Sequence, residues 1–240
     1  MILLNIHKTL YSSIYTKEGD PMTKAIIFDF DGLIVDTETV WYSIYKDYFQ
    51  SVHDYHLSLE EFTICVGSDS KVLFQQIEGK LNTTIDIDQF YEQGRPLFIE
   101  RSNHLPIMEG VEELILQAKD LGLKVALATS SQKERPLYHL DRLGILRHFD
   151  AITTSSEIKN RKPAPDLFLK SIEKLDIEPH EAIIFEDSNN GLIAGITAQI
   201  PVIVVPNSIT RHSNFDGYYD KLESVAHFNL KEHLKQKSDS

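Results

Sequence analysis

The chain has 240 residues and a formal net charge of −12 at pH 7, from 36 acidic and 24 basic side chains. An acidic chain without a basic run is not built to bind nucleic acid or an anionic membrane surface. No stretch approaches the ~20 apolar residues that span a bilayer. Cys65 is the single cysteine, which excludes an intramolecular disulfide, so we expect a cytoplasmic protein.

Residues 1–21 differ from the sequence that follows. The apolar residues 1–4 pass quickly into polar ones, and this run is shorter than the apolar core of a signal peptide. Met22 stands just before the first strand-like segment and would make a natural start. We expect residues 1–21 to be an N-terminal extension and assign them no function.

The first strand-like segment ends in two aspartates. Residues 25–28 form a short apolar run rich in β-forming residues. Asp29 and Asp31 come at its end, and Gly32 follows at once. This pattern predicts a buried parallel strand that stops at a turn. Both carboxylates would then lie where open α/β sheets bind their ligands.

A block of helical patterns follows this strand. Asp36 or Thr37 can cap its first helix. A block of this size is too large for a simple crossover, so we predict an inserted small α-helical cap domain over residues 37–104. The catalytic core would comprise residues 22–36 and 105–240. The expected helices of the cap are residues 38–53, 59–65, 70–79 and 86–103.

Strands and helices alternate after residue 105, which predicts a doubly wound, Rossmann-like parallel sheet. From about residue 218, we expect the tail to be helical. The further expected strands are residues 124–130, 151–154, 182–185 and 202–205. The expected helices are residues 111–120, 135–143, 166–175 and about 189–198, the last capped by Ser188.

Polar side chains stand at the ends of three of these strands. Since all strands of a parallel sheet point the same way, these groups should gather along one edge. Crowded carboxylates repel one another, which raises their pKa values. A divalent cation relieves this repulsion, and hard oxygen ligands of this kind suit Mg²⁺. The groups are Asp29 and Asp31, Thr129 and Ser130, and Glu186 and Asp187.

The same edge offers groups for a phosphate. The Thr129 hydroxyl and the backbone N–H groups of Ser130 and Ser131 suit phosphate oxygens at a strand-to-helix turn. Lys162 lies in a loop held by two prolines and can direct one positive charge at the phosphate. A carboxylate is a competent nucleophile toward phosphorus and gives an aspartyl-phosphate.

On these motifs the chain resembles the haloacid dehalogenase superfamily, in the branch of β-phosphoglucomutase and small sugar-phosphate phosphatases. The resemblance covers about residues 24–207 and includes four motifs in order. These are Asp29-Phe30-Asp31-Gly32, the hydroxyl of Thr129, Lys162, and the acidic pair Glu186-Asp187.

The resemblance implies roles for these residues. Asp29 would attack phosphorus, while Asp31 would protonate the leaving alkoxide and then activate a water, so its pKa should lie above that of Asp29. Mg²⁺ would be held by the Asp29 side chain, the Asp31 main-chain carbonyl, Asp187 and Glu186. The leading hypothesis is therefore a Mg²⁺-dependent phosphatase of a small phosphorylated metabolite, and the resemblance implies a sugar phosphate.

The cap departs from the mutase-like relatives. Trp41 stands near their histidine and Ser70 near the arginine that holds a second phosphate; Lys71 is a possible substitute. These differences favour hydrolysis over the alternative, a β-phosphoglucomutase-like phosphomutase. Trp41 either lines the substrate or packs between cap and core, and Gly67 serves a turn or a specificity loop. A non-enzymatic binding protein is a third hypothesis, and we expect a monomer or weak dimer.

Overall fold

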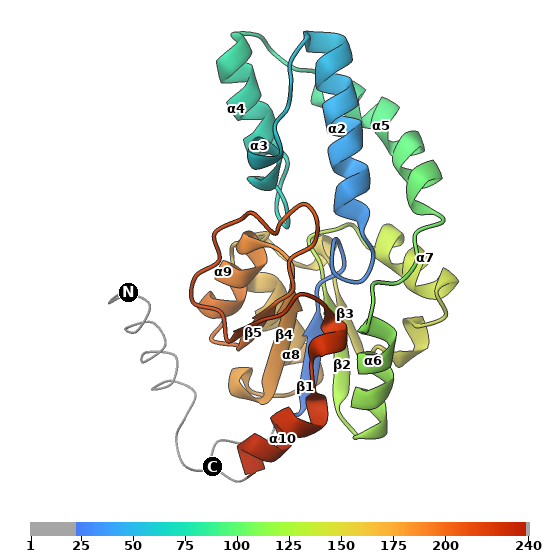
Figure 1. Ribbon diagram of the computed structural model, residues 1–240, viewed down its shortest axis with the longest axis vertical. Helices are drawn as coiled ribbons and strands as arrows, with labels where there is room; N and C mark the ends of the chain where they lie inside the picture. Colours follow the sequence, from blue (N-terminus) through green and yellow to red (C-terminus); the bar gives the residue numbers. More distant parts are fainter. Residues whose placement is uncertain (1–22, 239–240) are drawn as a thin grey trace.

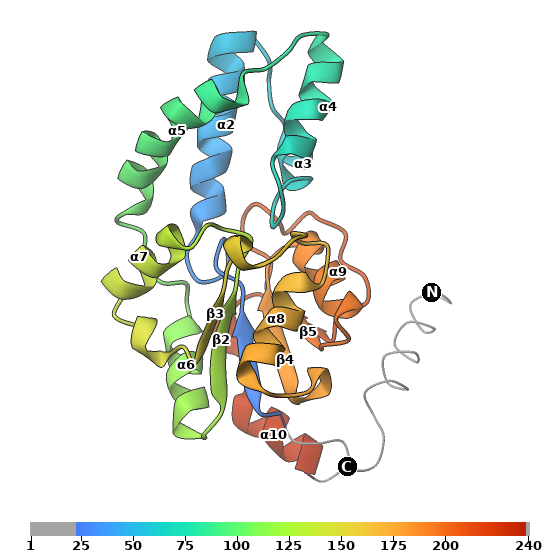
Figure 2. The same cartoon turned by 180° about the vertical axis from the view of Figure 1, so that it is seen from behind.

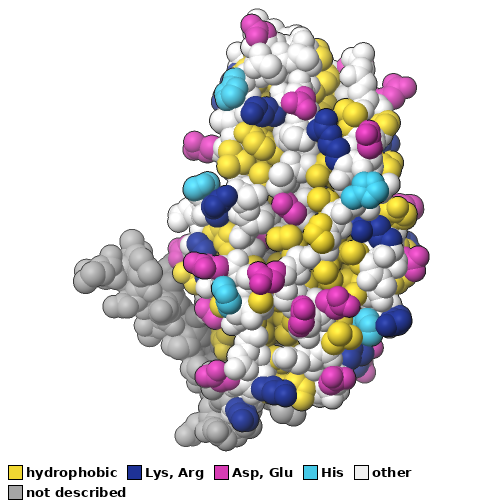
Figure 3. All heavy atoms as spheres, turned by 45° about the vertical axis from the view of Figure 1, so that its right-hand side comes forward, with side chains coloured by type: hydrophobic (Ala, Val, Ile, Leu, Met, Phe, Trp, Pro, Cys, Tyr) yellow, Lys and Arg dark blue, Asp and Glu magenta, His cyan; other side chains and the backbone are white. Residues whose placement is uncertain are grey.

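The computed structural model describes residues 23–238, shown in Figure 1. The extension predicted over residues 1–21 lies outside the described residues. Among the helices that are described, none has both the length and the apolar character needed to cross a membrane. On the face of the molecule shown in Figure 3, acidic, basic and apolar side chains are interspersed.

The core is a parallel sheet of six strands in the order β3-β2-β1-β4-β5-β6. The first strand, β1, lies in its middle, with Phe28 opposite Leu127 on one side and Phe185 on the other. The aspartates that follow β1 therefore leave the sheet at its centre. The strands are β1 (Ala25–Phe28), β2 (Lys124–Ala128), β3 (Ala151–Thr153), β4 (Ala182–Glu186), β5 (Val202–Val204) and β6 (Asp220–Lys221).

Helices cover both faces of this sheet (Figures 1 and 2). Successive side chains of a strand point to opposite faces, and β1 follows this rule: Ile26 and Phe28 join one buried apolar cluster, while Ala25 and Ile27 join another. Helices α6 (Val111–Asp120), α7 (Glu134–Arg142) and α10 (Leu230–Ser238) contribute to the first cluster. Helices α8 (Asp166–Leu175) and α9 (Asn189–Thr197) contribute to the second.

Four helices form the cap, which stands beyond the carboxyl end of the sheet (Figure 1). The cap has an apolar cluster of its own, in which Tyr45, Phe74 and Phe90 pack ring against ring. This cluster lets the cap pack as a compact unit over the core. The helices are α2 (Thr37–His53), α3 (Leu59–Thr63), α4 (Lys71–Leu81) and α5 (Ile87–Ser102).

Two local predictions need correction. Asp36 alone caps α2, because its carboxylate accepts from the Thr39 N–H at 3.2 Å, whereas the Thr37 hydroxyl donates to Asp31. The tail is not helical from residue 218: β6 extends the sheet, a 3₁₀ turn follows at Val225–His227, and α10 begins only at Leu230. A strand of two residues is too short to show a periodicity in the sequence.

Candidate active site

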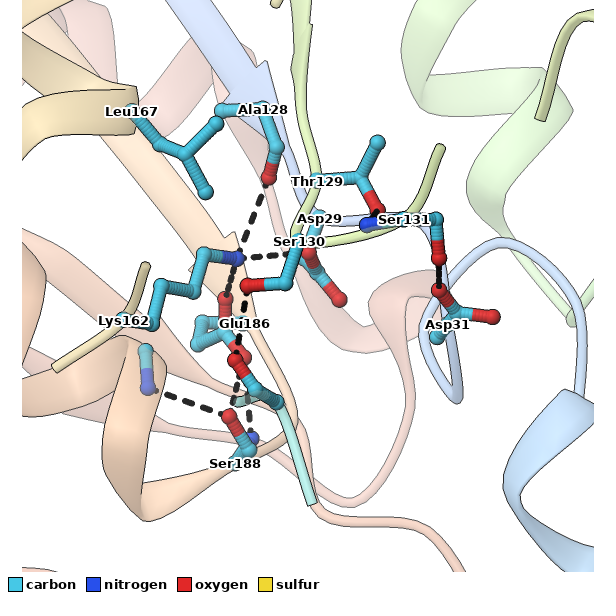
Figure 4. Close-up of polar contacts among 12 residues, drawn as sticks. Asp29, Asp31, Ala128, Thr129, Ser130, Ser131, Lys162, Leu167, Glu186 and Ser188 are labelled. Carbon is cyan, nitrogen blue, oxygen red and sulfur yellow. Dashed lines mark hydrogen bonds and ion pairs between the residues drawn. The ribbon is translucent and has the colours of Figure 1, made fainter. Parts of the chain in front are cut away.

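The predicted strand ends meet at one edge of the sheet (Figure 4). Asp29 follows β1, Thr129 follows β2, and Glu186 is the last residue of β4. All three side chains are buried. Lys162 reaches the same point from the loop before α8, so four segments of the chain converge there, as the parallel topology requires.

The ammonium of Lys162 links these groups. Its Nζ donates to Asp29 Oδ1 at 2.6 Å, to Glu186 Oε2 at 2.8 Å and to the Ala128 carbonyl at 3.1 Å. The side chain is fully buried and its Nζ lies 4.9 Å from the centre of the Phe168 ring. Burial by itself lowers the pKa of Lys162, but the charges of Asp29 and Glu186 outweigh it and raise that pKa.

Three carboxylates at this edge carry more negative charge than one lysine balances. Oxygens of Asp29, Glu186 and Asp187 lie within 4.8 Å of one another. Burial, then the charge of Glu186, raises the pKa of Asp29 to about 8, and the same two causes raise the pKa of Asp187 well above its usual range. A cation bound here would let all three ionise.

The donor set fits Mg²⁺, which prefers carboxylate oxygens. Asp187 Oδ1 is buried and has no hydrogen-bond partner in the part of the chain that the structure describes, so it can meet a cation. Glu186 differs, since Lys162 takes Oε2 and the Ser188 N–H and hydroxyl take Oε1 at 3.1 and 2.6 Å. The oxygens of Asp29 and Asp187 are therefore better placed for direct ligation than those of Glu186.

Asp31 has both of its carboxylate oxygens engaged. Oδ1 accepts from the Thr37 hydroxyl at 2.6 Å. Oδ2 accepts from the Ser131 hydroxyl and, at 2.8 Å, from Arg135 Nη2. Among the described residues, Oδ1 accepts only the bond from Thr37, so it keeps a lone pair with which Asp31 could meet a substrate proton.

The predicted phosphate ligands are next to these carboxylates but are engaged by the protein itself. Thr129 Oγ1 accepts from the Ser131 N–H at 3.0 Å. The Ser130 hydroxyl donates to the carbonyl of Gly67 in the cap, at 2.9 Å. Ser130 therefore contacts the cap with its side chain rather than presenting its hydroxyl to the acidic cluster.

A loop of the cap lies against this edge of the core. The Ser68 hydroxyl donates to the Lys162 carbonyl, and Asn190 Nδ2 donates to the Val66 carbonyl at 2.8 Å. Between them Gly67 has a φ of 75°, a conformation that favours glycine. Gly67 thus makes the predicted turn and touches the core beside the site, while its part in a specificity loop stays a prediction.

The other predicted cap residues mainly contact the cap. Trp41 stacks on Phe98 at 4.5 Å between ring centres and meets Tyr91 edge-on at 6.0 Å. The Ser70 hydroxyl is hydrogen-bonded to the Tyr91 hydroxyl. Lys71 is exposed, and among the described residues its ammonium has no hydrogen bond or ion pair. The structure does not bring Ser70 or Lys71 to the acidic cluster.

Sequence reasoning missed three residues of the site. Asn207 donates to Asp187 Oδ2 at 2.7 Å and to the Gly32 carbonyl at 3.0 Å; it follows β5, so the rule of strand ends would have found it. Glu38, at the start of α2, is 7% exposed and close enough to Asp31 for its charge to act on it. Arg135 had no signal, because it is one of several charged residues after β2.

The comparisons with known proteins agree with this geometry. The family model described as "Haloacid dehalogenase-like hydrolase" matches residues 26–205. The chain therefore belongs to the haloacid dehalogenase-like hydrolases, and its cap and parallel core are those of a hydrolase of this family.

Individual relatives cover most of the chain. "Putative phosphatase YhcW" of Bacillus subtilis is 35% identical over 87% of this chain and 95% of its own length. "Phosphorylated carbohydrates phosphatase" of Thermotoga maritima is 29% identical over 74% of this chain and 82% of its own. The crystal structure of CbbY from Rhodobacter sphaeroides in complex with phosphate, 26% identical, has a TM-score of 0.72 and covers 89% of this chain and 100% of its own.

Proposed function

We propose that this hydrolase is a Mg²⁺-dependent phosphatase that cleaves a small phosphorylated metabolite, a sugar phosphate, through an aspartyl-phosphate. The contact between Lys162 and Asp29 carries the proposal: a buried ammonium lies 2.6 Å from a carboxylate at the carboxyl end of the central strand. Such a pair neutralises charge where a phosphoryl group would meet the carboxylate. The relatives named as phosphatases support the same reaction class.

In this mechanism Asp29 is the nucleophile. A bond forms between its carboxylate oxygen and phosphorus while the bond from phosphorus to the leaving oxygen breaks, and Asp31 gives that oxygen its proton. Asp31 then takes a proton from a water that attacks the phosphorus of the aspartyl-phosphate, which restores Asp29 and releases phosphate. Mg²⁺ held by Asp29, the Asp31 carbonyl and Asp187 would balance the charge of the carboxylates and the phosphoryl oxygens.

The cap supports hydrolysis over the phosphomutase alternative. A mutase must hold a second phosphate at the cap while the first is transferred. Near the position where the mutase-like relatives carry an arginine, Ser70 is hydrogen-bonded within the cap to Tyr91, and Lys71 next to it is exposed. A cytoplasmic location remains part of the proposal, because the single buried Cys65 suits a reducing compartment.

Phosphate release from a panel of sugar phosphates, measured with Mg²⁺ and with a chelator, tests the proposal. We expect turnover only with Mg²⁺, and a loss of at least ~1,000-fold in Asp29→Asn, whose amide is not a nucleophile. Undiminished turnover in Asp29→Asn would contradict the assigned nucleophile. Interconversion of phosphate isomers that depends on a bisphosphate, with little phosphate released, would instead establish the mutase.

A further inference from the structure

Arg135 is a cation beside Asp31 that the proposed hydrolysis does not use. It lies in the first turn of α7, and its Nη2 donates to Asp31 Oδ2 at 2.8 Å and to the Ser131 hydroxyl. The proposed proton transfers of Asp31 give this guanidinium no part, so the pairing calls for another purpose.

The guanidinium also reaches the cap. Its central carbon lies 5.0 Å from the centre of the Phe98 ring on α5, and Phe98 stacks on Trp41 of α2. Stacking on an aromatic face fixes the plane of a guanidinium and leaves its N–H groups to bind in that plane. Arg135 therefore stands between Asp31 of the core and the aromatic side chains of the cap.

One nitrogen of this guanidinium has no hydrogen-bond partner among the described residues. Arg135 Nη1 is buried and bonds to none of them, although Nη2 makes two hydrogen bonds. A buried donor without an acceptor is costly, and such groups in native proteins need an explanation. Nη1 has no access to solvent. A hydrogen-bond acceptor for Nη1 must therefore bind before the cap closes over the core.

The position of Arg135 indicates what that acceptor is. Asp31 must meet the leaving oxygen of the substrate, so a group bound to the same carboxylate lies beside the carbon atoms that carry this oxygen. Arg135 would then meet a substituent on the leaving group. The charge of the phosphoryl group itself would be met by Lys162. The acceptor is an oxygen on a carbon close to the ester.

Glu38 narrows the class of that oxygen. It is buried, it makes no hydrogen bond or ion pair with any of the described residues, and Asp31 and Arg135 are near enough for their charges to act on it. A hydroxyl can accept from Arg135 and donate to a carboxylate at the same time. A carboxylate or second phosphate would also accept from Arg135, but it would be repelled by Asp31 and, unlike a hydroxyl, would have no proton to donate to Glu38.

We propose that Arg135 forms a subsite for the leaving group and recognises a hydroxyl on a carbon next to the phosphate ester. The inference rests on the proposed phosphatase activity and gives its substrate class: monophosphates of polyhydroxylated alcohols and sugars. Specificity then arises partly in the core, from a side chain on α7, and the subsite is complete only with Phe98 of the cap in place.

Three small esters test this subsite: propyl phosphate, which has no hydroxyl, glycerol 3-phosphate, and phosphoglycolate, which has a carboxylate. The measured quantity is the ratio of kcat/KM for glycerol 3-phosphate to that for propyl phosphate. We expect a ratio of at least ~10 in the unaltered protein, since a hydrogen bond to a charged donor contributes about tenfold or more. In Arg135→Gln the ratio should fall to within about threefold of unity. A change that alters kcat/KM for both esters by the same factor cancels in this ratio.

Lys133→Gln is the matched control, because it removes a positive charge just before α7 from an exposed side chain, and it should keep the original ratio. Calorimetric Kd values for the same esters, in an Asp29→Asn background with and without Arg135→Gln, give the ratio even where turnover is lost. An unchanged ratio in Arg135→Gln, or a preference for phosphoglycolate, overturns the inference while the hydrolysis stands. If neither these esters nor the sugar phosphates are turned over, the proposed function itself is overturned.

Discussion

Lys162 is a buried cation whose loss we expect to affect both stability and chemistry. It is the only ammonium that bonds Asp29 and Glu186 among the described residues, and all three side chains are almost completely buried. Removing one partner of a buried ion pair costs roughly 3–5 kcal/mol, because the remaining charge has no compensation. We expect Lys162→Met, measured without Mg²⁺, to lower the free energy of unfolding by about 3 kcal/mol. Phosphate release should fall at least ~100-fold.

Lys170→Met is the control for this prediction. Lys170 pairs with Glu173 one turn along α8, and both side chains are substantially exposed. Exposed pairs contribute only about 0–1 kcal/mol, so this variant should unfold and react nearly as the unaltered protein does. Equal stability of the two variants in urea titrations would show that the Lys162 cluster does not hold the core together.

His139 gives the protein a pH-dependent stability. It is 2% exposed, and Arg142 Nε donates to its Nδ1 at 3.0 Å, which requires the neutral ring. Burial, then the charge of Arg142, lowers the pKa of His139 to about 4. The unfolded chain, with a histidine pKa of ~6.5, binds this proton first as the pH falls. The contribution is complete above about pH 6.5 and is lost toward pH 4, by up to about 3 kcal/mol.

Denaturant titrations at pH 7.5 and pH 4.5 measure this effect. His139→Gln has no ring to protonate, so its free energy of unfolding should fall less between these two pH values than that of the unaltered protein. His104→Gln removes an exposed histidine and should keep the original pH dependence. The same loss in all three proteins would mean that other groups account for it.

At the scale of an element, the loop that carries Gly67 connects the cap with the edge of the sheet where Asp29 and Lys162 lie. A Cβ built on Gly67 would overlap the hydroxyl oxygen of Ser188, and its φ of 75° disfavours other residues. We expect Gly67→Ala to push this loop away from Ser130 and Lys162. Strain of this kind costs of the order of 1 kcal/mol, and kcat/KM for any accepted phosphate ester should fall at least ~10-fold.

Gly79→Ala is the opposite case in the same cap. Gly79 lies inside α4, and nothing stands within 4 Å of a Cβ built there. Alanine favours helices over glycine by about 0.5–1 kcal/mol, so this variant should be slightly more stable and equally active. If both alanine variants behave alike in melting and steady-state kinetics, the Gly67 loop does not depend on its close contact with the core.

The same loop marks where sequence reasoning stops. Strand ends such as Asp29 and Asp187 were predictable, because a parallel topology fixes their common edge whatever the rest of the chain does. Contacts such as those of Ser130 with Gly67, or of Arg135 with Phe98, join segments far apart in the sequence. They depend on how the cap sits on the core, which no local pattern encodes.

At the scale of the whole molecule, the apolar cluster of the cap is distinct from the two clusters of the core, apart from Ile209, which follows β5 and belongs to the cap cluster. Polar contacts also join cap and core. The Thr37 hydroxyl at the start of α2 holds Asp31, and Arg142 Nη2 donates to the Leu105 carbonyl, at 2.7 Å, where the chain returns from the cap. Hydrogen bonds of this kind can be exchanged for bonds to water or substrate at small net cost. Because the apolar clusters of cap and core are largely separate, the cap can move without exposing them.

We expect Mg²⁺ bound at the acidic cluster to stabilise the whole molecule. An ion that binds only the folded protein stabilises it by RT ln(1 + [L]/Kd), about 2.7 kcal/mol at one hundred times the Kd. We expect Mg²⁺ to raise the melting temperature by several degrees and a chelator to reverse the change.

Asp187→Asn should melt higher than the unaltered protein without Mg²⁺, because a buried carboxylate with a raised pKa is removed. This variant should also show little response to the ion. Asp88→Asn, which removes an exposed carboxylate from the cap, should respond as the unaltered protein does. A response to Mg²⁺ that survives in Asp187→Asn would place the ion elsewhere.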